Sequence, residues 1–394
     1  MAPPAFPTEI HSMIIRFATY CPVYFDISPD PRFWPVDHEL YTVYNDISTD
    51  YMTKKALTLV SHQFRYASLP YLYEVVQVHE SSSMHRLADV LETTWSGVTT
   101  NDQEDPRKIQ HLFVSVMRAK DEQGKYSVFK SLGRILTHCG SLRGFGLYDA
   151  VPFRVDKPHS WLMSIPKGVR FIDWKGTVMA SDFPRVIGHV SESLIALRLS
   201  NLTVLDNNTS PHSASLPKLT HFAMPEEHAG IGVLNDWSMP SLTHLRVNVS
   251  SSSMLERVIG RVGNSLRNAI LGPRVAPELL LYIATVARNL EDCIYHFHVG
   301  MEQSWAMIRS HPSLKSIVVV FREFSAHASH NQWILSILCN HLQPLPEGHF
   351  PSLCRIGFVG IDPYSTFDAR NRAHLDELLN AWHASGIEVK YLGQ

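Results

Sequence analysis

Histidine is the residue type in this sequence that most invites a chemical role. Of the 394 residues 22 are histidines, and on a strand His296 and His298 would point to one side, where two imidazoles begin a metal site. No third ligand follows at metal-binding spacing, and the sequence contains no His-Glu-x-x-His motif. Gly144-x-Gly146 lacks the third glycine of a dinucleotide-binding loop. We therefore expect packed or solvated histidines in a protein that is not an enzyme and uses no metal or cofactor.

The cysteines and the N-terminus indicate the compartment. The five cysteines are odd in number and form no Cys-x-x-Cys pair, which predicts free thiols in a reducing environment. The N-terminus lacks a basic leader, and Glu9, His11 and Arg16 interrupt its first apolar stretch, so a secretory signal is not expected. We expect an intracellular protein of the cytoplasm or nucleus. The cysteines are Cys21, Cys139, Cys293, Cys339 and Cys354.

Charge and apolar content limit the partners. The chain has 35 Lys and Arg against 37 Asp and Glu, so its net charge of -2 gives no overall attraction to nucleic acid or to an anionic membrane. Hydrophobic residues make up 45% and charged residues 18%, below the roughly 25% of an average soluble chain. We expect a folded chain with a large core that binds neither nucleic acid nor membrane.

A repeated apolar pattern organises the chain behind these residues. The pattern apolar-x-x-apolar-x-apolar, as in Leu242-x-x-Leu245-x-Val247, begins at positions 109, 142, 169, 194, 219, 242, 266, 290, 314 and 353. The six consecutive steps from 169 to 314 are 23 to 25 residues long, a regularity that chance rarely holds over so many copies. The repeat therefore predicts one supersecondary unit per period.

The residues between the apolar patterns predict a helix in each unit. Ser253-x-x-Glu256 resembles a capping box ahead of an apolar stripe to Val262, Pro277 opens a second helix, and a third carries Trp305 and Ile308. A strand and a helix every 24 residues match the leucine-rich repeat, whose period is about 20 to 29 residues. We predict an α/β fold in which residues 79–394 form a leucine-rich-repeat solenoid with parallel strands concave and helices convex. A helix near His374 to Trp382 and a strand Ile387 to Leu392 would form the C-terminal cap.

Side chains that alternate with the inward residues of each strand are the candidates for substrate contact. They would point to the concave face, because successive side chains on a strand face opposite sides. His221 and His244 hold equivalent places one repeat apart, so we expect them to be neighbours and to make binding sensitive to pH. A solvated strand face without a partner is the alternative for each position. The candidates are Tyr148, Asp173, Lys175, Arg198, His221, His244, Arg246, Asp292 and His296.

The N-terminal segment resembles an F-box protein. Phe6-Pro7-Thr8-Glu9-Ile10 reproduces the opening Leu-Pro-x-Glu-Ile of that family's motif with Phe in place of Leu, and Leu57 to Arg65 matches its later Leu-x-Leu-Val-Ser-x-x-Phe-Arg. Pro70-Tyr71-Leu72-Tyr73-Glu74 and the valines that follow resemble the junction in many fungal F-box proteins. We therefore assign residues 1–78 to an F-box-like helical segment, with helices after Pro7 and over about 53–67. A connector at 21–52, longer than the family usually has, departs from the motif.

The resemblance implies a role in ubiquitin transfer. F-box proteins with leucine-rich repeats are substrate-recognition subunits of SCF-type cullin-RING ubiquitin ligases: the box docks a Skp-type adaptor on the cullin scaffold, and the repeats bind a protein substrate. The alternative is a non-ligase leucine-rich-repeat interaction scaffold with a degenerate F-box. Carried over by position, the adaptor contacts are Phe6, Pro7, Ile10, Ile14, Leu59, Val60 and Phe64, unless these side chains only pack the segment internally.

Overall fold

The protein folds into a sheet of parallel strands with helices between them. The computed structural model describes residues 7–18, 52–95, 109–115, 122–148, 160–179, 182–205, 213–224, 236–248, 250, 252–298, 305–321, 328–345, 349–360 and 369–392. In these residues twelve strands form one sheet in which the spatial order β1 to β12 is the order in the sequence. Neighbouring strands pair in parallel, for example β1 with β2 and β10 with β11. The α/β repeat fold predicted from the sequence is confirmed.

The strands begin where the repeat predicts them. Each of the ten apolar patterns starts two residues before a strand, from position 109 and β2 to position 353 and β11. The strands are β1 Val75–Val78, β2 His111–Ser115, β3 Gly144–Tyr148, β4 Phe171–Met179, β5 Ala196–Leu205, β6 His221–Met224, β7 His244–Val247, β8 Asn268–Leu271, β9 Asp292–His296, β10 Ser316–Val320, β11 Arg355–Val359 and β12 Glu388–Leu392.

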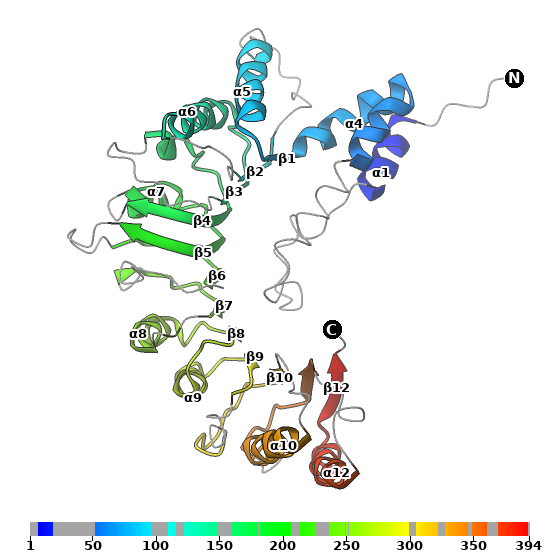
Figure 1. The fold of residues 1–394 in the computed structure, drawn as a ribbon, viewed down its shortest axis with the longest axis vertical. Helices are drawn as coiled ribbons and strands as arrows, with labels where there is room; N and C mark the ends of the chain where they lie inside the picture. Colours follow the sequence, from blue (N-terminus) through cyan, green and yellow to red (C-terminus); the bar gives the residue numbers. More distant parts are fainter. Residues whose placement is uncertain are drawn as a thin grey trace, which may run out of the picture. The chain divides into compact units, whose positions relative to one another are not determined.

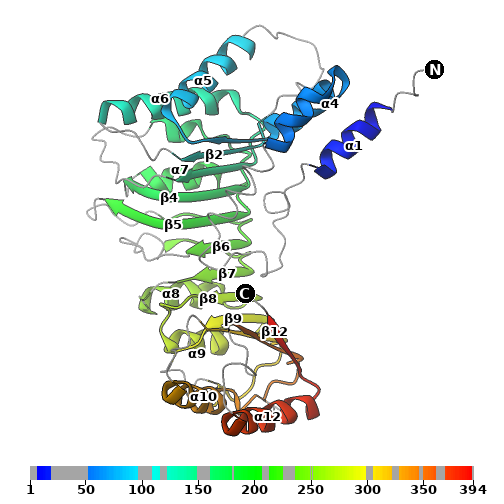
Figure 2. The ribbon, with the colours of Figure 1, turned by 45° about the vertical axis from the view of Figure 1, so that its right-hand side comes forward.

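Helices connect most of these strands, and Figure 2 shows them beside the strands of each unit. Three helices precede β1: α1 Thr8–Ala18, a helix over 52–60 and α4 His62–Glu74. The helices between strands are α5 Ser81–Trp95, α6 Glu122–His138, the 3-10 helix Ser160–Ser164, α7 Asp182–Val190, α8 Ser252–Val262, α9 Pro277–Val286, α10 Ala328–Leu342 and α12 Ala369–Ala384. Among the described helices, none combines the length and the apolar character that crossing a membrane would require.

Rows of inward side chains form the core. Phe222, Leu245 and Ala269 are direct partners in the register of β6, β7 and β8, and all three are buried. The apolar residue that opens each pattern is buried as well, as at Leu242 and Leu290. Each fully buried leucine contributes roughly 1.5–3 kcal/mol. One unit has too little surface to bury such a row alone, so the core is shared between successive repeats.

A backbone hydrogen-bond motif aligns each repeat with the next. The residue directly before a strand accepts two N–H groups from the following repeat: the Thr243 carbonyl oxygen lies 2.9 Å from the amide nitrogens of both Arg267 and Asn268. The Arg143 carbonyl accepts in the same way from Arg170, at 2.7 Å, and from Phe171, at 3.0 Å. We call these positions the edge ladder. The carbonyls that accept two N–H groups are those of Gln110, Arg143, Arg170, Thr220, Thr243, Arg267, Glu291 and Lys315. Glu74 before β1 and Cys354 before β11 each accept one, and Ile195 lies between Arg170 and Thr220 in strand order.

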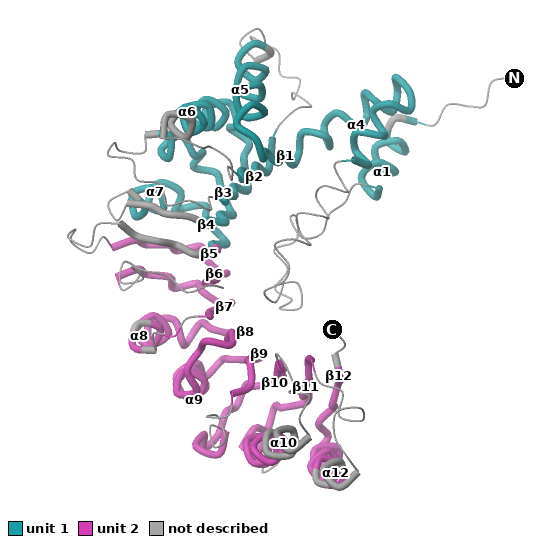
Figure 3. The backbone as a smooth tube through the Cα atoms, in the orientation of Figure 1, with its two compact units in different colours: residues 1–197, 202–209 teal, residues 198–201, 210–394 magenta. Residues whose placement is uncertain are grey.

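The chain divides into two compact units (Figure 3), of which unit 1 comprises residues 1–197 and 202–209. Helices α5, α6 and α7 lie on one side of β2 to β4, and α1 and α4 lie beyond the edge strand β1 (Figure 1). The inward Trp174 contacts Phe183 of α7 with ring centroids 6.0 Å apart. Arg134 of α6 bonds Glu92 of α5 at 2.5 and 2.6 Å, so an ion pair joins these two helices.

Unit 2 comprises residues 198–201 and 210–394, and α8, α9, α10 and α12 lie on one side of its strands (Figure 1). A buried polar network joins β9 to α10: the Tyr295 hydroxyl lies 2.7 Å from His341 Nε2 and accepts from Trp305 Nε1 at 3.0 Å. The last repeat ends in α12 and β12. Its Trp382 is buried and stacks on Phe358, with ring centroids 6.2 Å apart. The predicted C-terminal helix and strand are both present.

Three local predictions were wrong. The helix expected over 53–67 is divided at Ser61, whose hydroxyl caps α4 by accepting from the Phe64 amide at 3.2 Å. The expected end near residue 67 is also wrong, because α4 continues through Pro70 to Glu74. A helix was also expected around Trp305 and Ile308, but residues 305–307 form only a turn.

Candidate protein-binding surfaces

Exposed apolar side chains concentrate in the N-terminal helices. In the part of the chain that the structure describes, twelve large apolar side chains are exposed, and eight of them lie in α1, in the helix 52–60 and in α4. Phe17 is 83% exposed and Leu59 78%. Exposed apolar side chains that gather in one region of a chain are typical of a protein-binding surface. The eight, which we call the N-terminal apolar residues, are Ile10, Met13, Ile14, Phe17, Met52, Leu59, Val60 and Tyr66.

The packing of α1 decides which of its side chains remain exposed. His11 and Ile15, four residues apart, are buried, and the His11 ring meets the edge of Phe64 in α4 at a centroid distance of 4.9 Å. Arg16 bonds both carboxylate oxygens of Glu74 at 3.0 Å, which ties α1 to the end of α4 directly before β1. With these residues facing α4, helical spacing turns the stripe of Ile10, Met13, Ile14 and Phe17 away from it.

The adaptor contacts predicted from the sequence fall mostly on this exposed set. Pro7 is exposed at the start of α1, and Ile10, Ile14, Leu59 and Val60 all belong to the N-terminal apolar residues. The remaining described residue, Phe64, is half-buried against His11. Phe6 lies outside the described residues, as does most of the connector 21–52.

Sequence reasoning missed part of the exposed set. Met13 and Phe17 share the helical stripe of Ile10 and Ile14, and this spacing was the signal that marks them. Met52 and Tyr66 had no such signal, because their exposure depends on where the helix breaks at Ser61.

The candidate substrate contacts lie on the strands as predicted, but most are buried. In unit 1 the Tyr148 hydroxyl donates to Asp173 Oδ2 at 2.8 Å, and Lys175 is half-buried. In unit 2, Arg246 and His296 are buried, whereas Arg198 and Asp292 are half-buried. An expectation of a freely solvated strand face is therefore not met at Tyr148, Asp173, Arg246 and His296, which are all less than a tenth exposed.

His221 and His244 are neighbours, as the register predicts. They are direct partners on β6 and β7, and their rings stack with centroids 4.1 Å apart and planes 10° apart. Burial, and after it the His244 imidazole, lowers the pKa of His221 from the usual 6.5 to about 3. At neutral pH His221 is therefore an uncharged hydrogen-bonding group.

The described residues contain no arrangement suited to metal binding. No group of three or more His, Cys, Asp or Glu side chains within them is placed to hold an ion. Cys139, Cys293 and Cys339 are free and buried, and burial raises their pKa values to about 12, 12 and 11. These thiols are poor nucleophiles. Cys354 is free and exposed, and Cys21 lies outside the described residues.

Comparisons with known proteins find likeness only at a distance. No protein-family model matches the chain, and no curated protein matches it significantly. Among solved structures, the leucine-rich repeat-containing protein LegL7 from Legionella pneumophila shares 9% identity over 73% of this chain and 84% of its own, with a TM-score of 0.31. The structure of the Rad7 and Elc1 complex in yeast matches at 12% identity over 88% of this chain and 96% of that chain, with a TM-score of 0.30. Scores this low carry no argument about fold or function.

Proposed function

We propose that the protein is the substrate-recognition subunit of an SCF-type cullin-RING ubiquitin ligase. The F-box-like segment docks a Skp-type adaptor, and the repeats bind a protein substrate. The single observation that carries this proposal is the exposure of Ile10, Ile14, Leu59 and Val60, which are the positions that the F-box resemblance assigns to the adaptor. If these four side chains were buried, they would instead support the alternative that they only pack the segment internally.

The strand repeats support the second half of the proposal. Of the candidate strand side chains, Lys175, Arg198 and Asp292 stay partly exposed, and extended surfaces built from successive repeats suit protein recognition. A receptor of this type is not an enzyme. It raises the local concentration of a substrate lysine near the ubiquitin-carrying enzyme, which is an effective-concentration effect.

Adaptor docking is tested by placing charges in the exposed apolar residues. We expect the double variant Ile10→Asp/Val60→Asp to lose binding to a purified Skp-type adaptor in a pull-down assay, because buried carboxylates at an apolar interface are costly. The melting temperature should stay within about 2 °C of the natural chain, because both side chains are exposed. Val90→Asp/Met163→Asp is the matched control: it adds the same charge at exposed apolar positions elsewhere in unit 1 and should leave adaptor binding intact.

Two results contradict the proposal. If the natural chain fails to retain the adaptor, both with and without residues 21–52, the non-ligase scaffold with a degenerate F-box becomes the better account. If the control loses binding as fully as Ile10→Asp/Val60→Asp, docking does not depend on the predicted contacts.

A further inference from the structure

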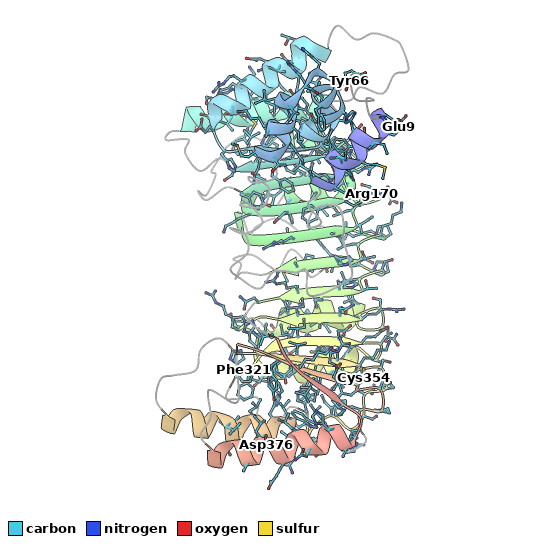
Figure 4. The ribbon with its side chains drawn as sticks, turned by 90° about the vertical axis from the view of Figure 1, so that its right-hand side faces the viewer. Glu9, Tyr66, Arg170, Phe321, Cys354 and Asp376 are labelled. Carbon is cyan, nitrogen blue, oxygen red and sulfur yellow. The ribbon has the colours of Figure 1, made fainter. Side chains whose placement is uncertain are left out.

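Two arginines stand side by side on the edge ladder of unit 1. Arg143 and Arg170 directly precede β3 and β4, and the Arg170 amide donates to the Arg143 carbonyl oxygen at 2.7 Å. Adjacent strands lie about 4.8 Å apart, so the two side chains leave the backbone at that spacing. Both are exposed, and Figure 4 shows Arg170 beside the start of its strand. Like charges at directly neighbouring positions are destabilising unless something compensates them.

The same ladder in unit 2 is compensated within the protein. Arg267, Glu291 and Lys315 occupy three successive positions, and the central carboxylate bonds both neighbours, Arg267 at 3.2 Å and Lys315 at 2.6 Å. In unit 1 the positions that flank the arginine pair are Gln110 and Ile195, which carry no charge. Within the described residues, neither Arg143 nor Arg170 has a carboxylate in ion-pair contact.

One further positive charge, that of Lys167, lies close to the pair in the sequence. Lys167 is exposed in the turn that leads into Arg170. His111, the register partner of Gly144 next to Arg143, adds no charge at neutral pH, because burial and then the charges of Arg143 and Lys54 lower its pKa to about 4. On the other side of Gln110 the next ladder position is Glu74, whose carboxylate is already bonded to Arg16. Glu192 precedes Ser193, whose hydroxyl donates to the Lys167 carbonyl, and its exposed side chain makes no ion pair with a described residue.

We propose that Arg143 and Arg170, assisted by Lys167, bind an acidic segment of a partner protein through its Asp or Glu carboxylates. Each guanidinium offers a planar set of donors that matches a carboxylate, and two of them about 5 Å apart engage neighbouring carboxylates of one peptide. The net charge of the whole chain is -2, so attraction of an acidic partner has to be local. The identification of this partner as the ubiquitylation substrate rests on the proposed function. The existence of the binding site does not.

The probe is a fluorescein-labelled peptide of twelve residues with alternating Glu and Ser, measured by fluorescence anisotropy with the full chain. We expect the double variant Arg143→Gln/Arg170→Gln to weaken binding about tenfold at low salt, and added salt to reduce the affinity of the natural chain. Arg267→Gln/Lys315→Gln is the matched control. It removes two positive charges from the same ladder in unit 2 and should change the affinity less than twofold.

Three further probes test which kind of ligand the arginine pair prefers. They are an uncharged peptide of alternating Gln and Ser, the same peptide with phosphoserine in place of Ser, and a twelve-nucleotide single-stranded RNA. The proposal is overturned if the Glu peptide does not bind, if both double variants weaken it equally, or if only the phosphopeptide or the RNA depends on Arg143 and Arg170. Adaptor binding should be unchanged in Arg143→Gln/Arg170→Gln. If this variant loses peptide binding and keeps adaptor binding, the result bears only on the arginine site. If the natural chain does not bind the adaptor, the result bears only on the proposed function.

Discussion

His244 is hydrogen-bonded at both ring nitrogens, and these bonds favour one tautomer. The Asn268 amide nitrogen lies 2.8 Å from His244 Nε2, and an amide NH2 only donates, so Nε2 accepts. The Nδ1 proton then points to the Thr243 hydroxyl at 2.8 Å, which itself donates to the Thr220 carbonyl at 3.2 Å. A neutral His244 stacked on His221 satisfies this network, whereas two protonated rings 4.1 Å apart would repel each other.

Acid should destabilise the fold through His221. Because the folded pKa of about 3 lies below the usual 6.5, only the unfolded chain binds this proton between those values. The stabilisation is complete above about pH 6.5 and is lost as the pH falls toward 3. From this group alone we expect the free energy of unfolding to be about 2 kcal/mol lower at pH 5 than at pH 7.

Urea unfolding at pH 7 and pH 5 measures this effect. His221→Asn should show a smaller difference between the two pH values than the natural chain. His383→Asn, at an exposed position of α12, is the control and should behave as the natural chain does. An unchanged pH difference in His221→Asn would contradict the expectation.

The sequence could not predict which of the candidate strand side chains are buried. The positions of Tyr148 and Asp173 on one face followed from strand alternation, but their burial and mutual hydrogen bond depend on repeats 25 residues apart. Phe113 shows the same dependence, because it lies where a side chain on Gly146 of the next strand would collide with it. A glycine in a strand gave no hint that an aromatic ring would cover it.

At the scale of elements, two glycines near the C-terminal end adopt the same left-handed backbone conformation for different physical reasons. Gly360 follows β11 with φ of 78°, and a Cβ there would collide with the carbonyl oxygen of Phe321. Gly386 follows α12 with the same φ of 78°, but no atom lies within 4 Å of its Cβ position. It ends the helix in a left-handed turn, where the Trp382 carbonyl accepts from the Ile387 amide at 2.9 Å.

Alanine at these two positions should separate backbone strain from collision. Gly386→Ala carries only the left-handed strain and should cost about 1 kcal/mol of unfolding free energy. Gly360→Ala adds the collision with a backbone atom that has little freedom to move, and should cost about 3 kcal/mol or more. Chemical denaturation of the two variants compares these costs. Equal losses would show that β10 and β11 separate easily at this point.

The starts of β2 to β11 were predictable because each one follows an apolar residue that has to be buried. All ten patterns placed their strands correctly, even the irregular copies at Ile109 and Val169. Helix ends were less predictable, because they depend on local competition that periodicity does not report. Ser61 interrupts one apolar stripe by capping the next helix, and α4 continues through Pro70.

Across the whole molecule, each repeat depends on its neighbour for burial, so the ends need special treatment. At the C-terminal end, Phe358 is buried beneath Trp382 of α12 and Tyr391 of β12, at centroid distances of 6.2 and 5.8 Å. Strand β12 pairs along the whole of β11. Removing both elements would expose an apolar ring and an unpaired strand edge together.

Deletion of residues 361–394 should therefore cause self-association as well as loss of stability. Size-exclusion chromatography with light scattering should detect dimers or larger species. Trp382→Ala keeps the edge strand and serves as the comparison: it should lose about 3–5 kcal/mol of unfolding free energy yet remain monomeric. A monomeric deletion variant with an unchanged urea midpoint would show that α12 and β12 do not act as a cap.

The doubly accepting carbonyls of the edge ladder explain why repeat length varies so widely. Alignment between successive units is established at the point where each strand begins, by two N–H groups meeting one oxygen. Chain added after the strand has ended leaves that alignment untouched, which is how steps of 33 and 39 residues coexist with steps of 23. New loops can therefore arise at the far ends of the strands in related sequences without any slip of the sheet, and recognition can diversify there while the framework stays constant.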